Sequence, residues 1–515
     1  MSGGSWGRPR RMSLRGMRVV ERSGCFRVWL RDDAAVEEEL LANRPAEAEL
    51  TSYGDNDSVL DYLMESGLWT ILTGMEADGL KCRNGYRPAV LNGIEVIREL
   101  AGVGRIQQCG KVLSDTRLMM QAGFNLARLR RAAASEQSVI DTETLANHLS
   151  RISPESAQRT FGEYVREMRS RRLIRGKVYA ADAHEIVVRY GRRHERLGRV
   201  GAKYGFKLVI LINVREEKER IVGFAFAPLP TSERAMLLEI LERLHREVAP
   251  LEEWLQILLL DRGYWGAQYL LGLHEKYGIG VVTRAQHDGL EIVDYIETAL
   301  EDATWQETIE EHSRLGTIRV RAASVKDVPL YDKQERLLGR VNAVVADEFD
   351  ETGKRLTGED GKERPRFYYV TTLPLTKRAY RTRALYRRRW VIENQGFREL
   401  AQDWSINVLA GRRFNANYAR IAFVLMLYSA ERIMRMKDKE GWAKERERVR
   451  LMVGRGWLGG LNVVVYTPEG HLGLFKVRRY GEIVRQAERS RIMALVRSYH
   501  KRGRDLKDLL DNIEP

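Results

Sequence analysis

A phenol, a guanidinium and a carboxylate recur at helical spacing within one stretch of this 515-residue chain, residues 386–400. The stretch contains no Pro and is rich in helix-forming residues. In an α-helix, Tyr386, Arg389 and Glu393 would share one face, because positions i, i+3 and i+7 project together. A guanidinium binds phosphate with a fork of N–H donors, and a carboxylate is a hard ligand for divalent metals. The combination suits phosphodiester cleavage, although the same spacing also fits a solvated helix with ordinary salt bridges.

Two aspartates upstream favour the chemical interpretation. Asp182 ends an apolar run that begins at residue 177, and Asp261 ends a second run, so both are predicted at the ends of strands. With Glu393 they could hold two Mg²⁺ or Mn²⁺ ions, because oxygen-only ligands favour these metals over zinc. The alternative is that each Asp merely caps a turn or a helix. Asp261 carries more weight, because Gly263 in its Asp-Arg-Gly-Tyr context would allow a tight turn directly after the carboxylate.

Charge and composition narrow the class of partner. The chain has 86 Lys and Arg against 71 Asp and Glu, a net charge of +15, which predicts a polyanionic partner and nucleic acid before an anionic membrane. No apolar run approaches the roughly 18 residues of a membrane span, and the basic N-terminus lacks the apolar segment of a secretory signal. Cys25, Cys82 and Cys109 fit neither a disulfide framework nor a zinc cluster. A reducing, cytoplasmic location is expected.

Six regions are predicted along the chain. Two parts of a mixed α/β core are indicated by alternating strand and helix patterns, and short alternating runs between them predict a β-rich insertion, whose length of roughly 80 residues is unusual unless functional. The helical region before the core has basic ends, which fits either a DNA-binding domain or a scaffold. The six regions are a loose basic arm (1–56), a helical domain (57–175), the first core part (176–284), the insertion (285–365), the second core part (366–435) and a basic, helical C-terminal region (436–515).

The order of these motifs resembles the DDE transposases of the insertion-sequence-four group. The resemblance covers roughly residues 176–430 and rests on Asp182, on Asp261 with its Asp-Arg-Gly-Tyr context, on the long insertion, and on Tyr386-x2-Arg389-x3-Glu393. It implies an α/β fold of the ribonuclease H-like type. In that fold a mixed sheet is flanked by helices, and here it would carry a β-rich insertion and follow an N-terminal helical domain.

The resemblance also implies roles for individual residues. Asp182, Asp261 and Glu393 would be the catalytic, metal-binding residues, with two Mg²⁺ (or Mn²⁺) ions per active site. Trp305, the only Trp of the insertion, would either stack on a flipped base or be buried in the insertion's own core. The residues implied to contact DNA are Tyr386, Arg389, Arg388, Arg262, Trp305 and Arg398.

One position departs from the family's motif. The motif continues with a Lys seven residues after the Glu, and this chain has Leu400 there. Arg398 is basic, but on an α-helix it would lie about 140° around the axis from Glu393. Either another basic residue holds that phosphate, or the contact is absent.

A cut-and-paste DNA transposase is the expected function by this resemblance, cleaving element ends and joining the 3′-OH to target DNA. Its expected partners are double-stranded DNA, both the terminal inverted repeats and the target, and a second copy of the chain in a homodimer. No membrane partner is expected. The expected location is the cytoplasm of a prokaryote, near the nucleoid. Two alternatives remain: a host-adopted relative that binds DNA without cutting, and another ribonuclease H-like nuclease. Basic clusters at residues 128–131, 169–175, 387–389 and 412–413 would contact DNA phosphates. The DNA affinity would therefore fall steeply with salt concentration.

Overall fold

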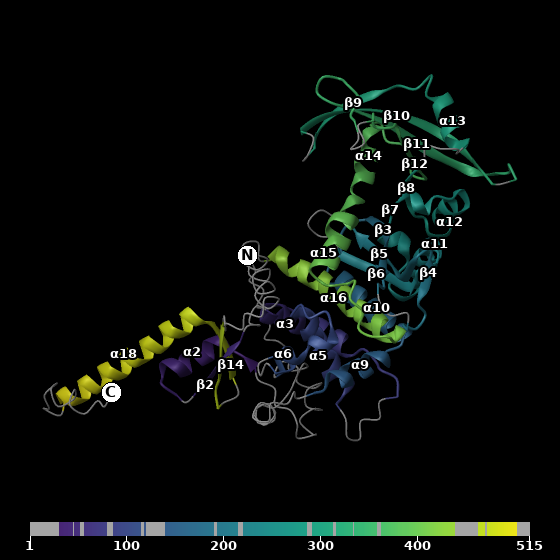
Figure 1. Ribbon diagram of the computed structural model, residues 1–515. Helices are drawn as coiled ribbons and strands as arrows, with labels where there is room; N and C mark the ends of the chain where they lie inside the picture. The colour runs from purple at the N-terminus through teal and green to yellow at the C-terminus, as the bar shows by residue number, and fades with distance from the viewer. Residues whose placement is uncertain are drawn as a thin grey trace. The chain divides into compact units, whose positions relative to one another are not determined.

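A long mixed β-sheet forms the centre of residues 152–436, which are one of the two compact units of the chain (Figure 1). The other unit combines residues 1–151 with residues 437–515. The predicted N-terminal arm up to residue 29 and the basic cluster at 128–131 lie outside the described residues. The computed structural model describes residues 30–44, 46–51, 56–79, 86–114, 118–119, 140–189, 193–214, 220–285, 291–312, 316–332, 334–357, 362–437, 462–468 and 471–501.

Five strands of this sheet make the ribonuclease H-like core. Their order is β6-β5-β3-β7-β8, with β5 antiparallel to β3 and β6, and with β7 and β8 parallel to β3. The apolar run of β5 is buried on both faces, as expected for a central strand. The short β4 (Gly198–Val200) pairs with β5 at the edge. The core strands are β3 (Val178–Val187), β5 (Lys203–Asn213), β6 (Arg220–Pro228), β7 (Ile257–Leu260) and β8 (Gly280–Arg284).

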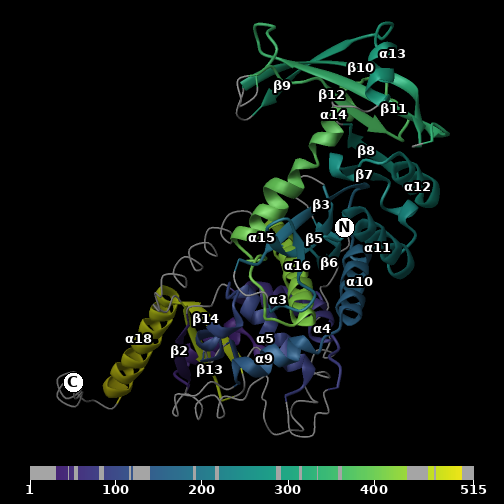
Figure 2. The same cartoon turned by 45° about the vertical axis from the view of Figure 1, so that its right-hand side comes forward.

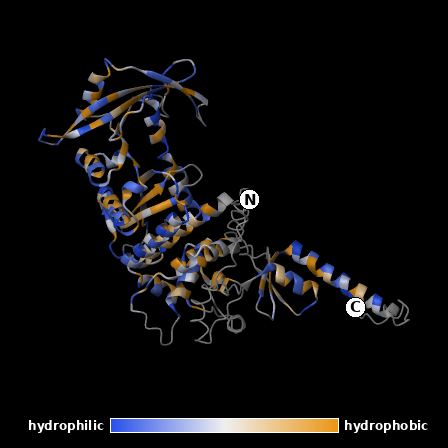
Figure 3. Cartoon of the chain, turned by 180° about the vertical axis from the view of Figure 1, so that it is seen from behind, coloured by the Kyte–Doolittle hydropathy of each residue, from blue (hydrophilic) through white to orange (hydrophobic). Residues whose placement is uncertain are grey.

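The region between the two core parts extends the same sheet. β12 (Phe367–Thr371) pairs with β8, and the order continues β12-β11-β10-β9 (Figure 2). β10 (Gly316–Tyr331) and β11 (Leu337–Phe349) are long, and both contain hydrophobic and polar residues (Figure 3). Helix α13 (Glu291–Ala299), which the sequence analysis did not predict, packs its apolar face on these strands and gives the region its own core. β9 (Gln306–His312) forms the outer edge.

Helices cover both faces of β6. A Cβ on Gly223 would lie 2.4 Å from Ile240 of α11 (Glu233–Glu247), so the absence of a side chain lets α11 approach the strand closely. The next residue, Phe224, faces the other way, because side chains alternate along a strand, and its ring contacts Phe161 and Tyr418. Those two rings belong to α10 (Pro154–Ser170) and α16 (Phe414–Lys437).

Helix α10 packs with the sheet although the sequence analysis grouped it with the N-terminal helices. The hydroxyl of Tyr164 donates to the carbonyl of Met426 in α16 at 2.7 Å, and the amide of Gln158 donates to the carbonyl of Phe224 in β6 at 3.0 Å. The helix pattern of this segment was read correctly, but a sequence pattern does not say which core an apolar face joins.

The second unit contains helices and a small sheet of order β1-β14-β13-β2. Residues 30–51 are therefore not a loose arm, because β1 and β2 pair with strands from the C-terminal region. Val36, Val465 and Ile483 form the centre of the apolar cluster between this sheet and its helices. The unit comprises β1 (Leu30–Arg31), α2 (Asp33–Leu41), β2 (Glu47–Thr51), α3 (Asn56–Glu65), α4 (Leu68–Thr73), α5 (Pro88–Leu100), α6 (Gly110–Ser114), α9 (Thr142–Ser150), β13 (Asn462–Tyr466), β14 (His471–Lys476) and α18 (Val477–Lys501).

Candidate active site

Asp182 lies in the middle of β3 and not at its end. The strand continues to Val187, because β5 pairs with it as far as Gly205. The parallel neighbour β7 is in register with β3 up to Ala181 and Leu260. The residue after each of these two is an aspartate. Asp182 and Asp261 therefore directly follow the last matched pair of β3 and β7.

Asp261 is held where β7 ends and a short 3₁₀ turn, Arg262–Tyr264, begins. Its backbone carbonyl accepts from the Tyr264 N–H at 3.0 Å and from the Thr283 hydroxyl at 3.3 Å. The expected reason for Gly263 is wrong: its φ is not positive, and a Cβ there would meet only Glu233 Oε2, at 3.8 Å. The turn is anchored instead by Tyr264, whose side chain is fully buried.

Glu393 lies on a helix that is not a regular α-helix. Helix α14 (Tyr380–Arg387) ends before Arg389, and a π-helix, Ile392–Phe397, precedes the short α15 (Arg398–Gln402). Segments of π-helix occur frequently at functional sites. The Phe397 ring at the end of this segment stacks on His184 of β3, with centroids 5.1 Å apart. This contact ties the segment that carries Glu393 to the strand that carries Asp182.

The three predicted carboxylates come together around one guanidinium, that of Arg389. Its Nη1 lies 3.1 Å from Asp182 Oδ2. Its Nη2 lies 2.7 Å from Glu393 Oε1 and 3.6 Å from Asp261 Oδ1. We call Asp182, Asp261 and Glu393 the carboxylate cluster. Three segments far apart in the sequence thus contribute to one site, which is where the sequence analysis expected the metal ligands.

Burial changes the acid–base properties of this site. Burial raises the pKa of Asp182 to about 6, although the Ala183 N–H and the Arg389 guanidinium both lower it. Burial alone would lower the pKa of Arg389, but neighbouring acidic groups, among them Glu393, raise it above its usual value. Burial also raises the pKa of Tyr386. Arg389 therefore remains a cation and compensates the negative charge of the cluster.

The cluster has the oxygen-only donors that Mg²⁺ and Mn²⁺ prefer, so its chemistry fits the metal expected from the sequence. Its geometry is that of an ion-pair cluster, because Arg389 lies between the carboxylates. Within the described ranges, no group of three His, Cys, Asp or Glu side chains is close enough to hold a metal ion. The carboxylates can serve as ligands only if the guanidinium moves.

The residues expected to contact DNA have different surroundings. Arg262, on the turn after Asp261, and Arg398, at the start of α15, are exposed. Tyr386 is only 3 % exposed, with its ring 5.7 Å from the Arg389 guanidinium and 5.3 Å from the ring of Tyr369. Arg388 donates to the carbonyl of Val214 at 2.7 Å.

Trp305 and Leu400 both pack against other parts of the protein. Trp305 is partly buried against the core of the insertion, and the guanidinium groups of Arg321 and Arg366 lie 4.7 and 5.3 Å from its ring. Leu400, at the position of the motif Lys, is fully buried.

Sequence reasoning missed Trp390, the residue directly after Arg389. It is 49 % exposed, which is high for an indole, and the Arg389 guanidinium lies 5.8 Å from its ring. An exposed aromatic ring beside a guanidinium, a group that can bind phosphate, suits stacking on a base. The sequence contained a signal for it: Trp390 comes four residues after Tyr386 and three before Glu393, so on a helix it would share their face.

An ion-pair network also went unpredicted. Arg383 of α14 is 1 % exposed and contacts Glu310 of β9 at 2.6 Å and Glu348 of β11 at 2.5 Å. Arg387, one turn further along α14, contacts the same Glu310 at 2.7 Å. The helix that leads to Arg389 is thus fastened to the insertion by charged groups, so the insertion helps to position the site.

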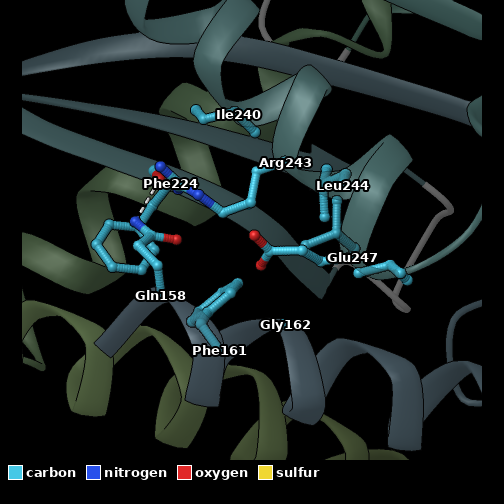
Figure 4. Close-up of a pocket in the computed structure, with 11 residues that line it drawn as sticks. Gln158, Phe161, Gly162, Phe224, Ile240, Arg243, Leu244 and Glu247 are labelled. Atoms are coloured by element: carbon cyan, nitrogen blue, oxygen red, sulfur yellow. Dashed lines mark hydrogen bonds between the residues drawn. The ribbon is translucent and has the colours of Figure 1, made fainter. Parts of the chain in front are cut away.

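A small pocket between α10, α11 and β6 is built from other residues (Figure 4). Phe161, Phe224 and Leu244 line it with apolar surface, and Arg243 and Glu247 supply charge. Arg243 is already paired with Glu239. None of the carboxylate cluster lines this pocket, so it is not part of the candidate active site.

The fold and the site together define a class of protein, a ribonuclease H-like domain with a three-carboxylate site. Comparison with protein families assigns it further: the family model of the transposase DDE domain matches residues 174–430, about half of the chain. This region belongs to that family, whose members are enzymes of DNA transposition and generally use divalent metal ions. No curated protein matches the chain. In the described parts of the chain, no helix is long and apolar enough to cross a membrane.

Proposed function

We propose that this protein is a cut-and-paste DNA transposase of the insertion-sequence-four group. It would cleave the ends of a mobile element and join the freed 3′-OH to target DNA. The single observation that carries the proposal is the convergence of Asp182, Asp261 and Glu393 on one point, within a region that matches the transposase DDE domain.

The carboxylate cluster would hold two Mg²⁺ or Mn²⁺ ions. When bound, such ions activate the attacking oxygen and stabilise the leaving oxygen of an in-line displacement. Asp182 and Asp261 would provide fixed ligands, because the matched strands β3 and β7 position both of them. Glu393 would complete the set from the π-helix.

Contacts to DNA would come from cations and rings around the cluster. Arg389 would bind the phosphate next to the cleaved bond, with Tyr386 packed against its guanidinium. The exposed Arg262, Arg398 and Trp390 would contact the strand on either side. The element ends and the target would be double-stranded DNA, and a homodimer would bring two ends together.

The decisive experiment is Mg²⁺-dependent cleavage and strand transfer on a duplex that carries the element's own end. Glu393→Gln keeps the size and polarity of the side chain but removes the charge that a metal ligand needs. We expect the variant to retain DNA binding and to lose cleavage by at least about 10³-fold, since loss of electrostatic stabilisation at one donor already costs about 10²–10³.

The alternatives give different results in the same assay. Equal cleavage by both proteins would refute the assignment of Glu393. No cleavage by either, with DNA binding intact, would support a protein that binds DNA without cutting it. Hydrolysis without strand transfer would indicate a ribonuclease H-like nuclease with another role.

A further inference from the structure

Arg389 is the only cation that contacts all three members of the carboxylate cluster among the described residues. Its side chain is 5 % exposed, whereas Asp261 and Glu393 are 38 % and 39 % exposed. The guanidinium is therefore the inner group of the site, and two of the carboxylates surround it on the solvent side.

A divalent ion and this guanidinium cannot occupy the site together. Carboxylate oxygens bind Mg²⁺ at about 2.0–2.1 Å, so the ligands must close on a point between them. The Nη atoms of Arg389 already lie 2.7 and 3.1 Å from oxygens of Glu393 and Asp182. Two positive groups so close would also repel each other strongly in a partly buried site.

The guanidinium is not fully satisfied where it lies. Its Nε is buried and has no hydrogen-bond partner among the described residues. The backbone around it departs from α-helical geometry, since α14 ends at Arg387 and the π-helix begins at Ile392. An irregular turn of this kind can change conformation without unwinding a long helix. A phosphate offers the same fork-shaped guanidinium two oxygens at once.

We infer that Arg389 is an internal counter-ion that closes the carboxylate cluster in DNA-free protein, and that a DNA phosphate draws it out so that divalent cations can enter. This inference rests on the proposed function, because it takes the cluster as the metal site. Its consequence is coupling: DNA should tighten cation binding, and the cation should tighten DNA binding by the same factor. Free protein would then be protected from cutting without an engaged end.

Mn²⁺ binding, followed by the loss of the free-ion EPR signal, tests this without measuring activity. The probe is Mn²⁺ alone, or Mn²⁺ with a duplex that carries an already cleaved element end and so cannot be cut again. Ions bound by the duplex alone are subtracted. For the wild-type protein, we expect weak Mn²⁺ binding without the duplex. With the duplex, we expect an Mn²⁺ affinity at least about tenfold higher, which corresponds to about 1.4 kcal/mol of coupling.

Arg389→Met removes the counter-ion and keeps an unbranched side chain. We expect the variant to bind Mn²⁺ at least about tenfold more tightly than wild type without DNA, and the duplex to add little further affinity. Arg336→Met is the matched control, because Arg336 also forms an ion pair with an Asp, Asp332, but on an exposed hairpin. It should bind Mn²⁺ as the wild type does.

A Glu393→Gln substitution in both backgrounds separates the two possible failures. If it weakens Mn²⁺ binding, but neither Arg389→Met nor the duplex changes the affinity, the metal site stands and the counter-ion role is wrong. If Glu393→Gln has no effect in either background, the carboxylate cluster does not bind the metal, and both proposals fall. Should Arg389→Met not fold, the wild-type titration with and without duplex decides: equal affinities would overturn the inference.

Discussion

Trp390 and Trp305 show how differently two residues of one type can be placed. Trp390 follows the central guanidinium of the site and is 49 % exposed. Trp305, which the sequence analysis considered for base stacking, is partly buried, contacts two arginines and packs against the core of the insertion. Burial of a Trp side chain mainly stabilises the fold, whereas an exposed ring is available to a ligand.

Substitution of these two residues should therefore give opposite results. Trp390→Ala should weaken binding of element-end DNA by about 5- to 150-fold, the equivalent of about 1–3 kcal/mol for one stacked base, with little change in stability. Trp305→Ala should lower the free energy of unfolding by about 3 kcal/mol. Electrophoretic mobility shift and urea unfolding measure the two effects. A Trp390→Ala protein that binds DNA normally would contradict the stacking role.

At the scale of elements, buried polar side chains join the helices of the N-terminal unit. Asn92 of α5 donates to the carbonyls of Thr73 and Met75, at 2.9 and 2.8 Å. Its Oδ1 lies 2.7 Å from Nε2 of His148 in α9, so that nitrogen carries the hydrogen. His148 is 2 % exposed, and burial lowers its pKa to about 4.

Acid should consequently weaken the packing of α9 on α5. The folded-state pKa of His148 is below the unfolded value of about 6.5, so the unfolded chain binds the extra proton between these values. The contribution of His148 to stability is complete above about pH 6.5 and falls as the pH drops toward 4, by about 3 kcal/mol in all. Urea unfolding at pH 7 and pH 4.5 would measure it. His148→Gln, which keeps a donor for Asn92, should remove this part of the pH dependence; an unchanged pH dependence would contradict the assignment.

At the scale of the whole molecule, positive charge is concentrated on some surfaces and neutralised on others. Helix α18 carries seven Lys or Arg against two Glu. Arg489, Arg491 and Arg497 are exposed on it, and Ile492 and Met493 are also about half exposed. Elsewhere much of the charge is paired, as in Arg171 with Glu167.

DNA binding by the whole chain should be strongly salt-dependent, and α18 should contribute. Each phosphate contact adds about 0.9 to the slope of log affinity against log salt. Replacing Arg489, Arg491 and Arg497 with Gln should reduce that slope, by about 0.9 for each that contacts a phosphate. The control replaces Arg243, Arg246 and Arg336, each already paired with an acidic residue and outside the basic clusters, and should leave the slope unchanged. Identical slopes for the two triple variants would exclude α18 from the DNA interface.

Local patterns were sufficient to predict much of the core. The strands around residues 206–214 and 221–227 and the helices after Pro88 and Pro154 are confirmed, because apolar spacing and helix-capping residues are local signals. The mixed α/β class is confirmed for the same reason. The length of β3 was wrong, because its second half is extended by pairing with β5, a neighbour that a local pattern does not reveal.

By itself, the sequence determined which residues could do the chemistry: two aspartates after apolar runs and a Tyr, Arg and Glu at near-helical spacing. Only the tertiary structure decided how they meet. The register of β3 with β7 aligns the two aspartates, and the π-helix brings Glu393 toward them. The tertiary structure also decided that Arg389 lies among the carboxylates and that Trp390 is exposed. It places β1 and β2 in one sheet with β13 and β14 of the C-terminal region. Residue type sets what a side chain can bind, but its partners depend on contacts between segments hundreds of residues apart.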